Sequence, residues 1–279
     1  MKVIKSVQEM RDYSRQLKGN KKTIASIDTD SYLHEGHMSL VKIAKDNVDT
    51  VIVTLNHCLQ ESTLSSKEYK KFLEKYTDKI FPLDIDLCKL YNVDAVFNTP
   101  QGSWNHKQNL DISIPNIDRL DNILNISMLA EIIQGIDIVS PDVVMGGQKD
   151  FYQTYVLRHL VEKSNPSIKV ITAPIFRDYD GLAFSSRNRF LTSGQRKRAT
   201  YIYKTLKEIS EWDSYSSAEE IKNHFTAAIK NARGYLDYID VCDVKTGEKL
   251  DVINTEAAIV VAANFGGTGL EDNIIIQPK

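Results

Sequence analysis

The chain has 279 residues, with 35 Lys and Arg against 37 Asp and Glu, and its formal net charge is −2. This near neutrality excludes the strongly basic field that general binding to nucleic acid or to an anionic membrane needs. No window approaches the roughly 18 consecutive apolar residues of a membrane helix, and the start lacks an apolar signal core, so we expect a cytoplasmic protein.

The first two-thirds of the chain alternate short apolar runs with longer amphipathic segments, which is typical of βαβ units around a parallel sheet. We expect strands at Thr23–Ile27, Thr50–Leu55, Asp94–Asn98, Asp142–Met145 and Lys169–Ala173. Apolar residues at three- and four-residue spacing predict helices at His37–Asn47, Lys67–Lys79, Asp84–Asn92, Arg119–Val139 and Asp150–Ser164.

The pattern changes after about Asn188, where polar helices precede strand-like runs separated by glycines. We expect helices at Ser193–Trp212 and Ser217–Ala232, and strands at Leu236–Asp243, Ala257–Ala263 and Asn273–Gln277. The fold class is therefore α/β with a smaller α+β C-terminal domain, and we place the boundary between residues 180 and 181. Cys58, Cys88 and Cys242 are odd in number and far apart, so we expect buried or partly buried thiols.

The most informative motif is His34-x-Gly36-His37, which leaves a predicted strand and enters a helix. Gly36 lets the backbone approach a phosphate, helical N–H groups point at it, and the two imidazoles can face the same oxygens. Such donors favour nucleotidyl transfer, because they stabilise charge on an α-phosphate as pyrophosphate leaves. A surface pair or a metal pair is the alternative, but no third His or Cys is placed to complete a metal site.

Two further clusters also fall at strand ends, where an α/β sheet binds its ligands. In Gly147-Gln148-Lys149-Asp150, the lysine is suited to a phosphate and the aspartate to ribose hydroxyls, although a turn with an Asp cap is an alternative. Ser185, Ser186 and Arg187 are suited to clamping a polyphosphate, although they are also compatible with a capped turn.

In order and spacing, these clusters resemble the pantoate–β-alanine ligase family over nearly the whole chain. The residues that carry the resemblance are Leu33–His37, Leu59, Gln60, Gly147–Asp150, Gln153, Arg177, Asp180–Ala183, Ser185–Leu191, Asp272 and Asn273. The resemblance implies a Rossmann-like nucleotidyltransferase (HxGH) domain with a C-terminal lid, in a homodimer. It also implies that ATP and Mg²⁺ are used to adenylate a carboxylic acid, whose acyl group then passes to an amine.

The resemblance also assigns roles to residues of this chain. His34 and His37 would stabilise the α-phosphate transition state, and together with Lys149 and Arg187 they form the expected catalytic set. The nucleotide-binding residues would be His34, Gly36, His37, Gly147, Lys149, Asp150, Phe176, Phe184, Ser185, Ser186 and Arg187, the two phenylalanines being equally compatible with a core. Gln60 and Gln153 match the family glutamines that hold pantoate. Mg²⁺ would bridge phosphate oxygens and water, and no protein metal ligand is assigned.

Departures from the family pattern are concentrated around the acid substrate. Asp28 and Asp30 stand where the pattern has apolar residues, and His57 and Glu61 also replace family residues in the segment around Gln60. Buried carboxylates need a cationic or hydrogen-bonding partner. We therefore hypothesise that Asp28, Asp30, His57, Gln60 and Gln153 bind an altered acid, one that bears an ammonium group, such as an amino acid. The alternatives are pantoate itself, a nucleotidyltransferase that forms no amide, and a catalytically silent nucleotide-binding module.

Overall fold

The structure, a computed structural model, describes residues 1–56, 75–98, 126–215 and 217–279, without the side chains of Asp30 and of residues 126–131. The chain forms two compact units. The first unit contains the described residues of 1–147 and 152–173, and the second contains 148–151 and the described residues of 174–279. The single boundary at 180/181 stays a prediction about domains, whereas the contacts assign the short segment 148–151 to the second unit.

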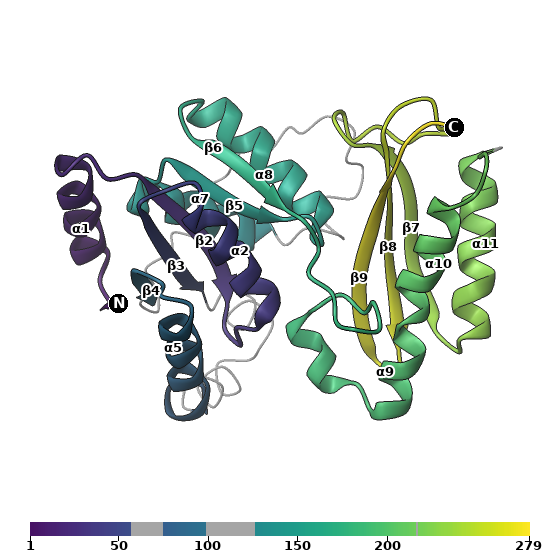
Figure 1. Cartoon of the computed structure of the whole chain (residues 1–279), viewed down its shortest axis with the longest axis horizontal. Helices are drawn as coiled ribbons and strands as arrows, with labels where there is room; N and C mark the ends of the chain where they lie inside the picture. The colour runs from purple at the N-terminus through teal and green to yellow at the C-terminus, as the bar shows by residue number, and fades with distance from the viewer. Residues whose placement is uncertain (57–74, 99–125, 216) are drawn as a thin grey trace. The chain divides into compact units, whose positions relative to one another are not determined.

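The first unit is built on a parallel sheet of strand order β1-β4-β3-β2-β5-β6 (Figure 1). Helices connect the strands, as parallel pairing requires. The strands are β1 (Lys2–Ile4), β2 (Ile24–Asp30), β3 (Thr50–Asn56), β4 (Ala95–Asn98), β5 (Val143–Gly147) and β6 (Lys169–Ala173). The described helices are α1 (Val7–Gly19), α2 (Glu35–Lys45), η1 (Tyr76–Ile80), α5 (Phe81–Leu90), α7 (Ile126–Val139) and α8 (Phe151–Ser164).

Both faces of this sheet are buried, which explains why its strands are continuous apolar runs. Side chains alternate between the faces: Ala25 and Ile27 pack with α2 and α5, whereas Ile24 packs with α1 and α7. Every residue of β3 is buried. At about 1.5–3 kcal/mol for each large apolar side chain, this burial is the main contribution to the stability of the unit.

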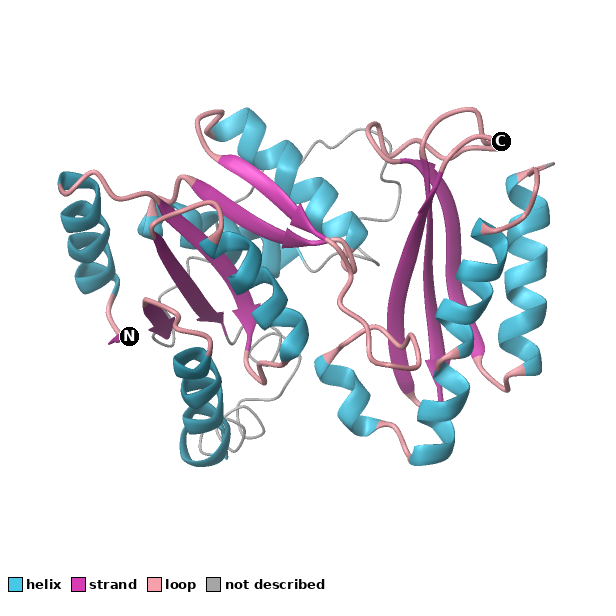
Figure 2. Cartoon of the chain, viewed as in Figure 1, coloured by secondary structure: helices cyan, strands magenta, loops and turns pink. Residues whose placement is uncertain are grey.

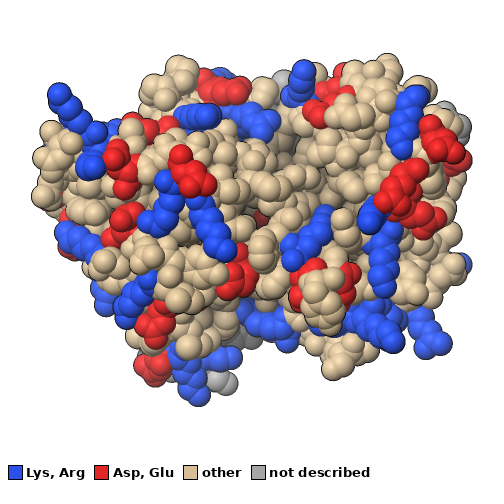
Figure 3. Space-filling model, viewed as in Figure 1, with Lys and Arg blue, Asp and Glu red and all other residues tan. Residues whose placement is uncertain are grey.

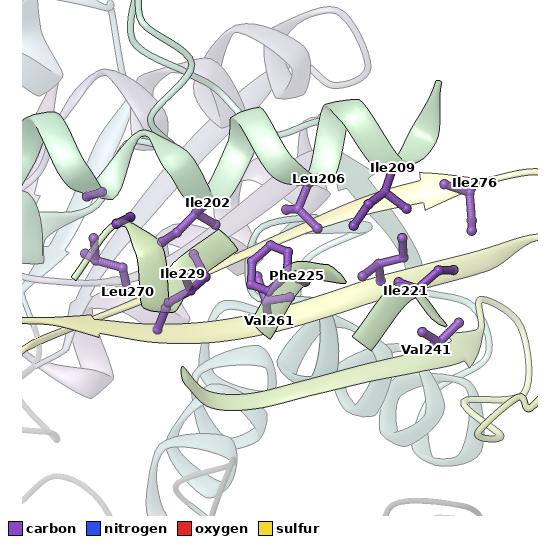
Figure 4. Close-up of a cluster of buried hydrophobic side chains, with 14 of the residues drawn as sticks. Ile202, Leu206, Ile209, Ile221, Phe225, Ile229, Val241, Val261, Leu270 and Ile276 are labelled. Atoms are coloured by element: carbon purple, nitrogen blue, oxygen red, sulfur yellow. The ribbon is translucent and has the colours of Figure 1, made fainter. Parts of the chain in front are cut away.

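The second unit has an antiparallel sheet of order β7-β8-β9, with helices along one face (Figure 2). Its core lies between the sheet and α10 and α11, where Leu206, Phe225 and Val261 meet (Figure 4). Its elements are η2 (Ser186–Phe190), α9 (Ser193–Ala199), α10 (Tyr201–Ser210), α11 (Ala218–Asn231), β7 (Tyr235–Asp243), β8 (Ala257–Phe265) and β9 (Thr268–Ile276).

The expected α/β class with a smaller α+β part is confirmed, while several element limits were wrong. β2 continues to Asp30. The prediction ended at Ile27 because the last residues of the strand are polar, and the strand was recognised by its apolar run. The expected helix Ser193–Trp212 is two helices that meet at Thr200, and β9 begins at Thr268 rather than at Asn273. The sequence patterns also missed β1 and α1. The expected helix at 67–79 and the first part of that at 119–139 lie largely outside the described residues.

Charged side chains of both signs are interspersed on the face shown in Figure 3, as the balanced composition leads one to expect.

Within the described part of the chain, no helix combines the length and the apolar character needed to cross a membrane. Cys88 and Cys242 are buried, as expected, and neither forms a disulfide with a described residue; Cys58 lies outside the described residues.

Candidate active site

The candidate residues fall into two groups, one in each unit, and each group is described within its own unit. In the first unit, His34 is the residue that caps the N-terminus of α2, directly after the loop that follows β2. His34 Nδ1 accepts a hydrogen bond from the Gly36 N–H at 3.1 Å, and His37 Nδ1 accepts one from the His34 N–H at 3.3 Å. The two rings stack with their centroids 4.0 Å apart.

These two hydrogen bonds define the tautomer of each imidazole. Because each Nδ1 accepts a backbone N–H, the proton of the neutral ring is on Nε2. Both rings therefore present an Nε2–H donor beside the first turn of α2, whose own N–H groups favour an anion. This arrangement can donate hydrogen bonds to phosphate oxygens, as the sequence motif predicts.

The loop that leads into this motif is held by Asp84, a residue that sequence reasoning missed. The buried Asp84 carboxylate, on α5, accepts hydrogen bonds from the N–H groups of Tyr32 at 3.0 Å and Leu33 at 2.8 Å. Tyr32 has a φ of 69°, in the left-handed region that non-glycine residues rarely adopt. The carboxylate therefore stabilises an unusual backbone immediately before His34. An acidic residue inside a mostly apolar helix was the available signal.

Asp28 lies on β2, opposite Thr54 of β3. Its Oδ2 accepts a hydrogen bond from Ser26 Oγ at 3.1 Å, while its Oδ1 is buried and has no hydrogen-bond partner among the described residues. Burial raises the pKa of Asp28 to about 7. Thr54 Oγ1 and Asn56 Oδ1 are likewise buried and unpartnered among the described residues. The carboxyl ends of β2 and β3 thus share a polar, incompletely satisfied patch.

The end of β5 is packed tightly against the start of α8. A Cβ on Gly146 would lie 2.7 Å from Cγ2 of Thr154, so this position has room only for glycine. Thr154 Oγ1 donates to the Gly147 carbonyl at 2.8 Å. A Cβ on Gly147 would meet nothing within 4 Å. Gln153 is half-buried in the first turn of α8.

In the second unit, the structure brings together Lys149, Asp150, Arg187 and a further residue, Glu271 of β9. Lys149 Nζ is paired with Asp150 Oδ1, and Arg187 Nη1 lies 3.4 Å from Glu271 Oε1. Burial by itself would lower the pKa of Lys149, but Asp150 and Glu271 outweigh it and the pKa is raised. The cluster thus holds two cations, each already beside a carboxylate. Sequence reasoning missed Glu271, because only the packing of η2 against β9 brings it beside Arg187.

The remaining predicted nucleotide residues flank a short hairpin of the second unit. Phe176 and Phe184 lie on the two paired arms of this hairpin, where the Phe184 N–H donates to the Phe176 carbonyl, and their ring centroids are 5.2 Å apart. Ser185 caps η2, and its hydroxyl accepts a hydrogen bond from the Arg187 N–H at 3.2 Å. Ser186 is the first residue of η2 and is half-buried. Phe176 is 38% exposed, which is compatible with a ring that lines a binding surface rather than a core.

Three predicted substrate residues cannot be placed in this way. His57 and Gln60 lie outside the described residues, and the side chain of Asp30, the last residue of β2, is not described either. Among the described residues, no group of three or more His, Cys, Asp or Glu is arranged to hold a metal ion.

Comparisons with known proteins agree with one another. Residues 2–275 match the family model described as pantoate-beta-alanine ligase. The pantothenate synthetase of Thermotoga neapolitana is 31% identical over 288 residues, covering 99% of this chain and all of that protein. The crystal structure of pantothenate synthetase from Thermus thermophilus has a TM-score of 0.80 at 22% identity and covers both chains fully.

A second solved structure is the pantoate-beta-alanine ligase of Francisella tularensis, which was crystallised with "Beta-gamma ATP" and β-alanine. It has a TM-score of 0.73 at 26% identity and covers 99% of this chain and 97% of its own. All three likenesses extend over the full length of the chain, through both compact units.

Proposed function

This chain belongs to the pantoate–β-alanine ligase family, and from that premise we propose that it condenses pantoate with β-alanine at the expense of ATP. The enzymes of this family are ATP-dependent ligases that form an amide and release AMP and pyrophosphate. The identity of the acid and of the amine is the proposed part. It is supported by the full-length match to pantothenate synthetases and by the β-alanine bound to the Francisella tularensis enzyme.

One observation carries the nucleotide step: the paired Nδ1 acceptors of His34 and His37 at the start of α2. We assign to their Nε2–H groups the stabilisation of the charge that builds on the α-phosphate while the acid's carboxylate attacks it in line. Pyrophosphate would leave against Lys149, Ser185, Ser186 and Arg187. The protein supplies no covalent nucleophile in this scheme, so its contribution is orientation and preset positive charge.

Lys149 pairs with Asp150, and Arg187 pairs with Glu271. We propose that the phosphates of ATP take the place of these carboxylates when the nucleotide binds. The side chains of Arg187 and Glu271 are 51% and 35% exposed, so their ion pair is weak and a polyphosphate can replace the carboxylate. Gly147 and Asp150 would meet the ribose, and Phe176 and Phe184 the adenine. These assignments rest on the family motif and on the grouping of the residues within the second unit.

Magnesium belongs to the proposal as the ion that neutralises the phosphates of ATP. Mg²⁺ prefers oxygen ligands and keeps several waters, so it needs few protein ligands. Asp150 and Glu271 offer carboxylate oxygens of the right chemistry near the proposed phosphate-binding cations, but each already pairs with a cation. We therefore assign the ion to the phosphate oxygens and derive no step from a protein ligand. The homodimer implied by the family also remains part of the proposal.

An altered acid remains the second candidate, because Asp28 favours it. Its buried Oδ1, together with Thr54 Oγ1 and Asn56 Oδ1, forms a polar patch that would suit a substrate group able to donate hydrogen bonds. The comparisons support the other alternative, pantoate, better than this hypothesis, since the relatives named here are pantoate enzymes. The sequence departures at Asp28 and Asp30 are thus insufficient by themselves to indicate a different acid.

A substrate panel tests the proposal directly. The purified protein, ATP and Mg²⁺ are combined with pantoate, other hydroxy acids or amino acids, with and without β-alanine, and pyrophosphate, AMP and amide are measured. We expect pyrophosphate release with pantoate, and amide only when β-alanine is also present. Turnover of an amino acid with none of pantoate would establish the altered acid instead. Pyrophosphate release with no amide under any amine would indicate a nucleotidyltransferase that stops at the activated product.

A further inference from the structure

Asn273 has no role in the proposed mechanism, yet its side chain makes three hydrogen bonds to the turn that contains Lys149. It lies on β9 and is fully buried. Its Nδ2 donates to the Gln148 carbonyl at 2.7 Å and to the Lys149 carbonyl at 3.0 Å. Its Oδ1 accepts from Gln148 Nε2 at 3.1 Å. One carboxamide therefore holds two consecutive peptide groups and one side chain of a turn that is 124–125 residues away in sequence.

The strand that carries Asn273 is itself held firmly. Its neighbour Asp272 forms two hydrogen bonds with the Arg177 guanidinium, at 2.7 and 2.9 Å. Asp272 Oδ1 also accepts from the Asn273 N–H at 2.8 Å, and the Asn273 carbonyl accepts from Arg177 Nη2 at 3.3 Å. The guanidinium lies over the Tyr203 ring, 3.8 Å from its centroid. A charge-assisted, bidentate pair of this kind is a strong and directional contact.

β9 also presents Glu271, two residues before Asn273 and on the same face of the strand. Glu271 is one of the charges that act on Lys149, and it pairs with Arg187. One strand thus contacts the backbone of the Lys149 turn through Asn273 and acts on its ammonium group through Glu271. The segment 148–151 belongs to the second unit because of contacts of this kind.

We propose that Asn273 is a positioning residue for the adenylation step, one that holds the backbone of Gln148 and Lys149 so that the Lys149 ammonium is fixed where the phosphates of ATP bind. The proposal rests on the proposed role of Lys149. A displacement of about 1 Å in a positioning group can lower a rate about 10²-fold. Loss of the Asn273 contacts should therefore slow adenylation without removing any group that touches ATP.

The main test is a double-mutant cycle with Asn273→Asp and Lys149→Ala. Asn273→Asp keeps the size of the side chain but removes both donors and turns a carboxylate toward two carbonyl oxygens. We expect its kcat/KM for ATP to fall about 10–100-fold, with the KM for the acid unchanged. In the Lys149→Ala background the same substitution should change the residual rate less than 2-fold, because the residue through which it acts is gone.

The matched control is Asn264→Asp, at the end of β8 in the hairpin of the same sheet. The Asn264 side chain accepts a hydrogen bond from the Gly267 N–H at 2.8 Å, and Asn264 is not one of the proposed site residues. Its kcat/KM should stay within 2-fold of the wild-type value. Circular dichroism and thermal melting of each variant show whether it is folded.

Failure of this proposal can be told apart from failure of the proposed function. If Lys149→Ala leaves adenylation intact, the assignment of the phosphate site is wrong, and the proposal falls with it. If Lys149→Ala is severely impaired but Asn273→Asp has normal activity, the positioning role is refuted while the function stands. The same holds if Asn273→Asp lowers kcat/KM for ATP by the same factor with and without Lys149→Ala.

A second variant keeps the test decisive if Asn273→Asp does not fold. Gln148→Met removes only the hydrogen bond from Gln148 Nε2 to Asn273 Oδ1 and leaves both carbonyls bonded. We expect a smaller loss of kcat/KM for ATP, of 2-fold to 5-fold, that disappears in the Lys149→Ala background. No loss, or an equal loss in both backgrounds, overturns the positioning role.

Discussion

The ring of His34 stacks on the ring of His37, with the two centroids 4.0 Å apart and the planes inclined by 25°. Each ring accepts a backbone N–H through Nδ1, so the helix start that the motif forms also orients its two imidazoles. The His34 side chain therefore both caps α2 and, in the proposed mechanism, donates to the α-phosphate. A useful substitution must keep the cap and remove the donor.

His34→Asn should separate the capping role from the catalytic one. Asn is among the best N-cap residues, so we expect the free energy of unfolding to change by less than about 1 kcal/mol. Adenylation should fall by about 10²–10³-fold, the range found for the loss of a transition-state donor. Pyrophosphate release and urea unfolding measure the two effects. A wild-type rate in this variant would contradict the nucleotide-site assignment.

Glu271→Gln should strengthen the binding of ATP. Removing this carboxylate releases Arg187 from its ion pair, and it lowers the pKa of Lys149 toward its usual value. Because the Arg187 pair is exposed, we expect a modest gain, a roughly 2–5-fold lower Kd for ATP, which shrinks as salt is added. Calorimetric titration at two salt concentrations measures it. Weaker binding would mean that Glu271 assists ATP rather than competing with it.

Asp28→Asn should alter stability in a pH-dependent way. The pKa of Asp28 is raised from 3.8 to about 7, so the folded state keeps a proton that the unfolded state loses. The wild-type protein therefore loses stability as pH rises from about 4 to about 7, with no further change from this group above that range. The neutral carboxamide avoids this loss and can still accept the Ser26 hydrogen bond.

The measurement for Asp28→Asn is urea unfolding at pH 4.5 and pH 8. Relative to wild type, we expect the variant to be more stable at pH 8 than at pH 4.5 by roughly 2 kcal/mol, a value reduced from the full shift because Asp28 as a whole residue is only half-buried. If the free energies of unfolding of the variant and the wild type differ by the same amount at both pH values, the pKa of Asp28 is not raised by burial.

Gly146→Ala should destabilise the first unit, because the new Cβ would lie 2.7 Å from Cγ2 of Thr154. We expect a loss of about 1–3 kcal/mol, the usual cost of overpacking. Thr154→Ser in the same chain should restore part of it, since it removes the methyl group and keeps the hydroxyl bonded to Gly147. Gly147→Ala, which meets open space, is the matched control and should change stability by less than about 0.5 kcal/mol. Equal losses at the two glycines would refute this steric account.

The sequence was most informative where the pattern is local. Lys169–Ala173 was predicted with the correct limits, and the start of α2 was expected at the histidine motif, because strand runs and helix caps depend on neighbouring residues. Limits were wrong where polar residues continue a strand, as in β2 at Asp28–Asp30 and in β9 at Thr268–Asp272. An apolar run cannot show that the backbone pairing continues.

What the sequence by itself determined is the family, the α/β class with its smaller second part, and the candidate residues, since motif spacing and hydrophobic period are written along the chain. Only the tertiary structure decided that Asp84 holds the loop before His34, that Glu271 faces Arg187, and that Asn273 holds the Lys149 turn. Asn273 and Lys149 are 124 residues apart. Contacts over such separations depend on strand order, register and the packing of whole elements, none of which a local pattern encodes.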